Sequence, residues 1–397
     1  MPTALSPRTV ALVKASVPAL EAHGPAITEA MYRRLFRDPQ IAALFNHANQ
    51  RSGAQRFALA NAVLAYARHI ENPAALGAAI ERIAQKHVGY AILPEHYPHV
   101  AGALLGAMED ILGEAATPEL LAAWGQAYWF LAEILQARET EIREANEVQP
   151  GSWTGWRRFV VAERHSESDA ITSFILRPED DGPVVPHRAG QYLTLRFDAA
   201  GLEGAKRNYS ISCGANATHY RITVKREHDG EVSGFLHDRA VEGTVLEATA
   251  PAGDFYLAER PDRPVLLLSG GVGLTPMVSM LEVIADRHPK LPTWYIHATT
   301  DRANHALGAH VHALAKRHGQ VSTATFYDDH VTGSDAMRGR ITVDWLRENT
   351  PLQEAEIYLC GPKPFMRSLI TGLLQDGIPV DRIHYEIFGP GDEDLAA

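Results

Sequence analysis

The sequence predicts a multidomain protein with an all-α region first, an antiparallel β-barrel second, and an α/β region with a mostly parallel sheet last. Three successive patterns of apolar residues indicate this order. Apolar residues recur at helical spacing from residue 6 to about 145, alternate in short runs from 156 to 250, and then follow alternating strand-like and helix-like segments from Pro264 onward. The 397 residues suffice for two or three domains.

Composition narrows the class further. With 46% hydrophobic and 21% charged residues the chain is typical of soluble globular proteins, and a net charge of −11 argues against nucleic acid as a partner. We see no run of about 18 apolar residues and no signal peptide, so we expect no membrane span and a cytoplasmic location. Cys213 and Cys360 are far apart in sequence, which suits a reducing compartment, and we expect a monomer without a disulfide.

Start and stop signals divide the helical region. Ser6-Pro7 and Thr117-Pro118 each place a capping hydroxyl before a proline that fits a first helical turn. Further helices are expected at 25–36, 52–70, 73–86 and 94–112, between loops rich in Pro, Asn and Gly. The segment around Gln149-Pro150-Gly151 interrupts the periodicity and predicts a linker.

Short strands are expected after this linker. Six of them favour an antiparallel barrel or sandwich, at 156–163, 171–177, 191–197, 207–212, 220–225 and 244–250. Five more alternate with helices and favour a parallel sheet, at 265–269, 293–298, 321–326, 356–360 and 382–388. We therefore expect domains at 1–146, 153–261 and 262–397, with a linker at 147–152.

The string Arg207-Asn208-Tyr209-Ser210 lies in one of these alternating strands. An arginine offers a charged planar fork that suits a pyrophosphate, a tyrosine ring can stack on an isoalloxazine, and a serine hydroxyl can bond the flavin edge. By itself such a string is more often ordinary sheet surface. The flavin interpretation therefore depends on the motifs around it.

A glycine-rich turn, Ser269-Gly270-Gly271-Val272-Gly273-Leu274-Thr275-Pro276, joins an apolar strand to a helix. Glycines let the backbone approach a dinucleotide, and the helix start offers free amides to its pyrophosphate, although such turns are common without ligands. With Gly190-Gln191-Tyr192 before it and Tyr358-Leu359-Cys360-Gly361-Pro362 after it, this order resembles the ferredoxin-NADP reductase superfamily. The resemblance implies that residues 271–276 bind NADH or NADPH and that Cys360 lies beside the nicotinamide. From the strand alone, Cys360 could equally be a small buried residue.

His87 closes an amphipathic helical segment, where a neutral imidazole could hold an iron, although most of the 19 histidines should be structural or exposed. Phe45, Asn49-Gln50-Arg51, Lys86-His87 and Pro94-Glu95-His96-Tyr97 are similar to the globin pattern of the flavohaemoglobins, and this resemblance extends over essentially the whole chain. It implies haem b with His87 as the iron ligand, Phe45 packed against the porphyrin, and Lys86 among the haem-binding residues.

The same resemblance assigns three residues to the oxygen side of the haem, namely Tyr32, Gln55 and Leu59. A phenol aimed at the iron can donate a hydrogen bond to oxygen. From periodicity alone, Tyr32 could be a buried aromatic on a stripe with Ile27, Met31 and Leu35.

For FAD, the resemblance assigns Tyr192 and residues 207–210, with Glu386-Ile387-Phe388-Gly389-Pro390 closing over the isoalloxazine. The alternative for that last segment is a final hydrophobic strand ended by Gly-Pro. Lys225-Arg226 and Val232-Ser233 match the family only loosely as flavin-phosphate contacts.

Glu139 lies on an apolar stripe with Trp124, Tyr128, Leu131 and Leu135. A buried carboxylate needs a partner. From periodicity, that partner could be Arg138, Arg143 or solvent, whereas the resemblance implies a triad of His87, Tyr97 and Glu139.

The resemblance implies a nitric oxide dioxygenase, in which NAD(P)H reduces FAD, FAD reduces haem, and oxygen at the haem oxidises nitric oxide to nitrate. An oxygen carrier or sensor, or a flavin reductase of quinones, ferric chelates or lipid hydroperoxides, are the alternatives. Thr299-Thr300-Asp301-Arg302 contains both an acid that would favour NADH and a base that would favour NADPH, and we expect NADH.

Two features depart from the family pattern. The segments 198–206 and 328–338 are shorter than in relatives, which should alter loops and not sites. Trp129 stands where members of the family often have a small residue. If its indole points into the haem cavity, it would shrink the space beyond the iron and change which lipids or bulky ligands can enter.

Overall fold

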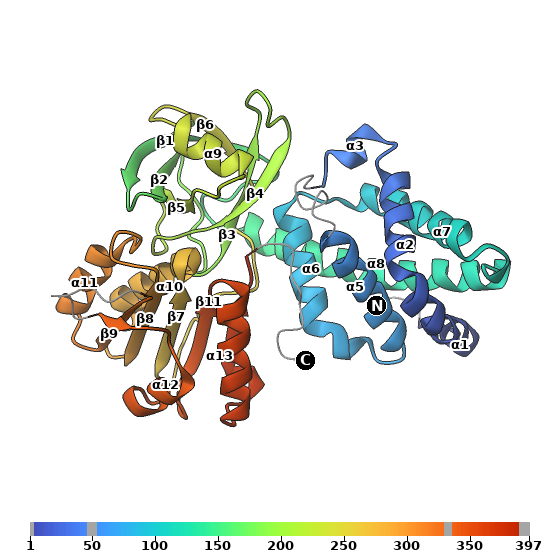
Figure 1. Cartoon of the computed structure of the whole chain (residues 1–397). Coiled ribbons are helices and arrows are strands. Elements are labelled where there is room, and N and C mark those ends of the chain that lie inside the picture. Colours follow the sequence, from blue (N-terminus) through green and yellow to red (C-terminus); the bar gives the residue numbers. More distant parts are fainter. Residues whose placement is uncertain (1–3, 46–53, 329–335, 389–397) are drawn as a thin grey trace. The chain divides into compact units, whose positions relative to one another are not determined.

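The computed structural model describes residues 4–45, 54–328 and 336–388, apart from the side chains of 54–58 and 73–74. Its contacts divide the chain into two compact units, one over Met1–Val148 and one chiefly over Gln149–Phe388 (Figure 1). Each unit has its own hydrophobic core.

The first unit is helical. Its described helices are α1 (Pro7–Ala15), α2 (Val17–Leu35), α3 (Pro39–Ala42), α5 (Ala54–Arg68), α6 (Gly77–Gly89), α7 (Tyr97–Leu112) and α8 (Pro118–Glu147), with short 3-10 turns at Pro73–Leu76, Pro94–His96 and Gly113–Ala115. Helix α2 packs on α5 and α7, and α6 packs on α8. A smaller apolar cluster between α6, α7 and α8 contains Ala84, Tyr97 and Leu135. These packed helices carry the haem-site residues that the sequence analysis proposed, except Phe45, which lies in the turn after α3.

The expected caps are present. The side-chain oxygens of Ser6 and Thr117 accept hydrogen bonds from backbone amides one turn ahead, and the prolines after them occupy the first turns of α1 and α8. The expectation that a helix begins at Pro25 is wrong, because Pro25 lies inside α2. Proline there removes one helical hydrogen bond, but α2 buries Leu20 on one side of it and Ile27 on the other, so packing maintains the helix.

The helix expected at 73–86 also differs. Residues Pro73–Leu76 form a 3-10 turn, and α6 begins at Gly77 and continues to Gly89. His87 therefore lies inside the last turn of a helix, where the direction of its side chain is fixed by the backbone.

The second unit begins with an antiparallel sheet. Its strands are β1 (Arg157–Ser166), β2 (Ile171–Pro178), β3 (Tyr192–Phe197), β4 (Ala205–Ser210), β5 (Tyr220–Lys225) and β6 (Val245–Ala248). Their order in the sheet is β4-β3-β6-β1-β2-β5. The helix α9 (Glu231–Asp238) lies between β5 and β6 along the chain. An antiparallel bridge joins Ile211, just after β4, to Ile222 in β5. The two ends of the strand order therefore meet, as they do in a barrel.

A parallel sheet follows. Its strands are β7 (Val265–Gly270), β8 (Thr293–Thr299), β9 (Val321–Tyr327), β10 (Met337–Arg338), β11 (Glu356–Cys360) and β12 (Ile383–Glu386), in the order β10-β9-β8-β7-β11-β12, and its helices are α10 (Leu274–Arg287), α11 (Gly308–Arg317), α12 (Val343–Asn349) and α13 (Lys363–Gln375). The pairings run parallel. The two-residue strand β10 was not expected from the sequence.

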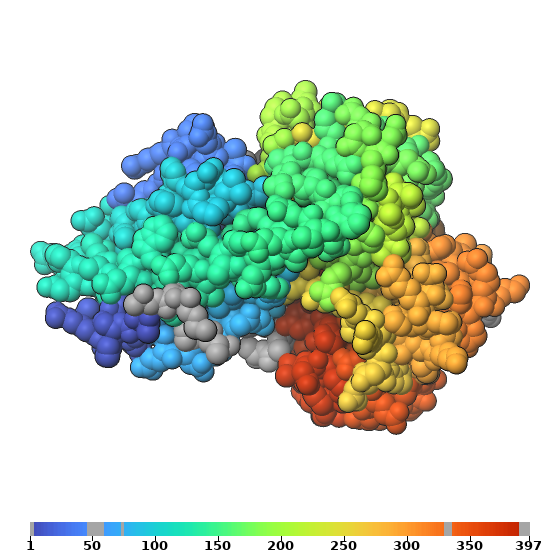
Figure 2. All heavy atoms as spheres, turned by 180° about the vertical axis from the view of Figure 1, so that it is seen from behind, coloured from blue at the N-terminus to red at the C-terminus, as the bar shows by residue number. Residues whose placement is uncertain are grey.

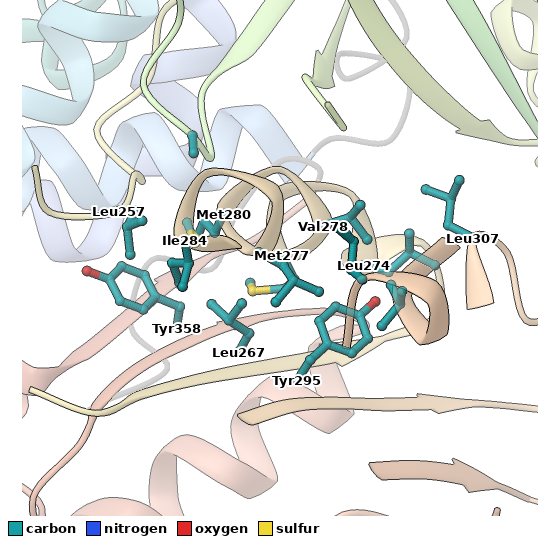
Figure 3. Packing of buried hydrophobic residues seen from close by; sticks show 14 of the residues in the cluster. Leu257, Leu267, Leu274, Met277, Val278, Met280, Ile284, Tyr295, Leu307 and Tyr358 are labelled. Carbon is teal, nitrogen blue, oxygen red and sulfur yellow. The ribbon is translucent and has the colours of Figure 1, made fainter. Parts of the chain in front are cut away.

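Helices cover both faces of this sheet. Met277, Met280 and Ile284 of α10 pack on Leu267 and Tyr295 of the strands (Figure 3), while α12 and α13 contribute to the cluster on the other face. In the space-filling view the residues of this domain form a continuous orange-to-red block (Figure 2). Because all strands are parallel, their carboxyl ends lie at one edge, where ligands of such sheets bind.

Of the helices that the structure describes, none is both long and apolar enough to cross a membrane.

Candidate functional site

Three helices bring together the residues proposed for the iron side of the haem. His87 lies in the last turn of α6, Tyr97 begins α7, and Glu139 lies in α8 with its side chain fully buried. One carboxylate oxygen of Glu139, Oε1, lies 2.7 Å from His87 Nδ1 and 2.5 Å from the Tyr97 hydroxyl. Burial and the hydrogen bond to Glu139 raise the pKa of Tyr97, so its hydroxyl keeps the proton that it donates. The arrangement leaves His87 Nε2 as the nitrogen available to an iron.

The second oxygen of Glu139 has a different partner. Arg143, one turn further along α8, places Nη2 3.3 Å from Glu139 Oε2. Arg138 points elsewhere and binds Glu81 of α6 at 2.6 Å. The structure therefore combines the triad with one of the partners that periodicity suggested.

An aromatic cluster lies on another side of the helical core. The ring of Tyr32 packs edge-on against Phe45, with centroids 5.7 Å apart, and stacks on Phe36 at 5.5 Å. Leu59 packs against the same core. Burial raises the pKa of Tyr32 to about 12. The side chain of Gln55 lies outside the described residues.

Two other residues of the helical unit that the sequence analysis named have exposed side chains. Lys86 is exposed next to His87, and Trp129 is 39% exposed with its ring edge-on to Tyr128. Whether Trp129 narrows the oxygen side of the haem stays a prediction.

The proposed flavin motif lies in β4. Alternate residues of a strand share a face, so Arg207 and Tyr209 lie on one face, and both are half-buried. Asn208 lies on the other face and accepts a hydrogen bond from Thr194 of β3 at 3.0 Å. Tyr192, at the start of β3, is 6% exposed. The strand pairing thus brings Tyr192 and the 207–210 motif into neighbouring strands.

Arg226, one of the four loosely matched flavin-phosphate residues, lines a cavity of about 420 Å³ at the start of α9. Arg226 is held by Asp238 at 2.5 and 2.8 Å, and the Ser233 hydroxyl binds the backbone of the turn before α9. Glu227, Asp229 and Glu231 also line this cavity. The expectation that Lys225, Arg226, Val232 and Ser233 add charge and donors to the flavin phosphates stays a prediction.

Three motifs meet at the carboxyl edge of the parallel sheet. The strand register places Cys360 of β11 beside Ser269 of β7 on one side and beside Glu386 of β12 on the other. A Cβ atom on Gly273 would overlap the backbone carbonyl of Cys360, so only glycine allows the turn to approach β11 this closely. Gly271 has φ +53°, a conformation that favours glycine.

The side chains at this edge differ in exposure. Cys360 is fully buried, and burial raises the pKa of its thiol well above the usual range, so the thiol is neutral. Ile387 packs against the core of the sheet domain and Phe388 is 39% exposed. Gly389 and Pro390 lie outside the described residues.

Sequence reasoning missed a polar chain at the same edge. Ser269 Oγ lies 2.9 Å from His297 Nδ1, the His297 ring packs 4.9 Å from that of His305, and His305 Nδ1 lies 2.9 Å from the Tyr327 hydroxyl. Burial lowers the pKa of His297 to about 3, so this imidazole is neutral. The available signal was a histidine within the apolar strand Trp294-Tyr295-Ile296-His297-Ala298.

Comparison with known proteins agrees with this arrangement. Family models match as Globin over residues 28–135, Oxidoreductase FAD-binding domain over 158–256 and Oxidoreductase NAD-binding domain over 267–370. The fold and sites thus define a haem- and FAD-containing, NAD(P)H-dependent oxidoreductase.

Full-length relatives identify the family. A flavohemoprotein of Xylella fastidiosa (strain 9a5c) is 59% identical over 397 residues, covering 100% of both chains, and one of Rhodopirellula baltica is 41% identical over 99% of this chain and 100% of its own. The chain belongs to the flavohemoprotein family.

Solved structures agree. A flavohemoglobin from Malassezia yamatoensis with bound FAD and heme superposes with a TM-score of 0.87 at 26% identity, over 98% of this chain and 100% of that one. The FAD/NAD-binding domain of a nitric oxide dioxygenase from Vibrio cholerae superposes with a TM-score of 0.55 at 37% identity, over 59% of this chain and 99% of that one.

Proposed function

We propose that this chain is a nitric oxide dioxygenase driven by reduced nicotinamide nucleotide. The observation that carries the proposal is the His87 imidazole held by a buried carboxylate, in the same chain as a reductase unit. When bound, FAD would supply the conversion of a two-electron hydride into single electrons, and haem held by His87 would supply the iron for the oxidation of nitric oxide to nitrate by oxygen. A carboxylate behind the iron ligand favours oxygen chemistry over reversible storage.

The helical unit supplies the ligand and a donor. Glu139 accepts the Nδ1 proton of His87, which fixes the tautomer and makes the imidazole a stronger electron donor through Nε2. We assign the Tyr32 hydroxyl as the donor to oxygen, and with a pKa of about 12 it keeps its proton at neutral pH.

The reductase unit binds and orients two nucleotides. We assign Arg207 to the flavin pyrophosphate and the Tyr209 ring to the isoalloxazine, since both lie on one face of β4. We assign the backbone amides of the glycine turn before α10 to the nicotinamide nucleotide, and the adjacent Cys360, whose carbonyl the turn approaches closely, to its nicotinamide ring.

We further propose NADH as the preferred electron source. The Asp301 carboxylate at the end of β8 is held by the backbone amide and side-chain amide of Asn304, at 2.9 to 3.1 Å, so an acceptor for a ribose hydroxyl is already in position. Arg302 beside it is exposed and would attract a 2′-phosphate. We expect a lower KM for NADH than for NADPH, and steady-state kinetics with both nucleotides checks this.

The central test uses the purified protein. Haem and flavin absorbance are recorded, and the loss of nitric oxide is followed with reduced nicotinamide in air and without oxygen. Rapid loss only with oxygen, with nitrate as the product, is expected. Equal rates in both conditions would contradict a dioxygenase, and reduction of quinones or ferric chelates without nitric oxide consumption would favour a flavin reductase.

The setting of the enzyme is part of the proposal. We expect a monomeric, cytoplasmic protein that acts on small molecules, with a lipid or other bulky ligand as a candidate for the haem cavity.

A further inference from the structure

The two oxygens of the Glu139 carboxylate are not equivalent. Oε1 takes both His87 Nδ1 and the Tyr97 hydroxyl, whereas Oε2 faces Nη2 of Arg143 at 3.3 Å. The Glu139 side chain is fully buried and that of Arg143 is 20% exposed. The guanidinium is therefore the positive group that faces this carboxylate from the side away from the imidazole.

The same nitrogen of Arg143 also donates a short hydrogen bond to the backbone carbonyl of Ile92. The Ile92 amide in turn donates to the carbonyl of His87 at 2.8 Å, and Ala91 between them has φ +55°. This turn ends α6, and its left-handed alanine is unfavourable by itself. Arg143 therefore touches both the carboxylate behind His87 and the turn that ends the helix of His87.

A carboxylate with partners on only one oxygen can rotate and exchange its oxygens. A guanidinium on the second oxygen removes that freedom, and it compensates a charge that would be costly to bury alone. Because Oε1 must serve two donors at once, a small rotation would weaken the bond to His87.

We propose that Arg143 is a positioning residue for the iron ligand: it locks the Glu139 carboxylate with Oε1 on His87 and holds the turn that ends α6. The inference rests on the proposed role of His87 as the haem iron ligand. Arg143 acts on the imidazole only through Glu139 and the backbone.

The test is the iron–histidine stretching frequency of the full-length, ferrous, haem-loaded protein, measured by resonance Raman spectroscopy. Arg143→Met is expected to shift the band downward and broaden it, since the bond from His87 to the carboxylate becomes weaker and more variable. Arg143→Lys keeps a charged donor and is expected to lie nearer to the wild-type frequency.

Arg138→Met is the matched control. Arg138 lies five residues earlier on α8 and also ties α8 to α6, because its guanidinium binds the carboxylates of Glu81 and Glu141 and not that of Glu139. The control removes an ion pair between the same helices and is expected to leave the frequency unchanged. An unchanged band in Arg143→Met, or the same shift in both methionine variants, would overturn the proposal.

Two further outcomes are distinguishable. If Arg143→Met fails to retain haem, the Arg143→Lys variant decides. A wild-type frequency in Arg143→Lys with full haem content supports the positioning role. A downward shift in Arg143→Lys as large as that expected for Arg143→Met contradicts the proposal that a charged donor at this position holds the carboxylate. If the wild-type protein itself shows no iron–histidine band, the assignment of His87 fails, and with it the basis of the inference, independently of Arg143.

Discussion

At the residue scale, Glu139 places a charged carboxylate on the apolar face of α8. Its stripe is otherwise apolar, and Trp124 and Leu135 on that stripe are buried as periodicity predicts. A carboxylate survives in this environment because His87, Tyr97 and Arg143 together satisfy both of its oxygens. The site is thus a buried polar network in which each member depends on the others.

We expect Glu139→Leu to retain haem, FAD and hydride transfer to the flavin, while haem reduction or nitric oxide turnover falls by about 10–100-fold, the usual cost of losing a hydrogen-bond partner of a metal ligand. The iron–histidine frequency should also fall, since the imidazole loses its acceptor. Stopped-flow spectroscopy separates the flavin and haem steps. Full turnover with an unchanged frequency would show that Glu139 has no influence on the iron ligand.

At the element scale, the glycine turn between β7 and α10 is defined by its closeness to β11. The turn passes the end of β11 so closely that a Cβ on Gly273 would overlap the Cys360 carbonyl. The approach aligns the start of α10 with the carboxyl ends of the strands, where a helix N-terminus can meet a pyrophosphate. The proposed site for the nicotinamide nucleotide therefore depends on Gly273, a residue without a side chain.

Gly273→Ala should raise the KM for NADH and slow flavin reduction by NADH, because the turn must move away from β11. Reduction of the haem by dithionite should be unaffected. Gly319→Ala is the control, since a Cβ there meets nothing within 4 Å. Equal flavin reduction rates in the two variants would mean that the close approach has no role in nucleotide binding.

At the scale of the whole molecule, the boundary between the two compact units falls between Val148 and Gln149, at the end of the long helix α8. Trp153, shortly after it, donates from Nε1 to the carbonyl of Ala248 in β6 at 3.0 Å, and Arg157 lies over its ring. The chain is thus anchored to the barrel within a few residues of the boundary. The three domain ranges given by the sequence stay a prediction.

Separate expression of the two sides of the boundary tests those ranges. Residues 1–146 should bind haem, and residues 153–397 should bind flavin and reduce artificial acceptors such as ferricyanide with NADH. Absorbance spectra of the purified pieces decide the result. A folded 153–397 piece that lacks flavin would show that the barrel is not the FAD domain.

The sequence by itself determined what depends on neighbours along the chain. Capping at Ser6 and Thr117, the switch from helical to alternating periodicity, and the glycine turn are local patterns, and the structure has helices and strands where they predict them. The family resemblance, carried by short motifs, is likewise confirmed by full-length relatives.

Only the tertiary structure decided what depends on distant contacts. Local propensity predicted a break at Pro25, but the burial of Leu20 and Ile27 against other helices maintains α2 through it. The side-by-side placement of Ser269, Cys360 and Glu386 depends on strand order, and the sharing of Glu139 between His87 and Arg143 depends on how α6 meets α8. Such pairings join residues far apart in sequence, and their energies come from packing and burial that no local pattern encodes.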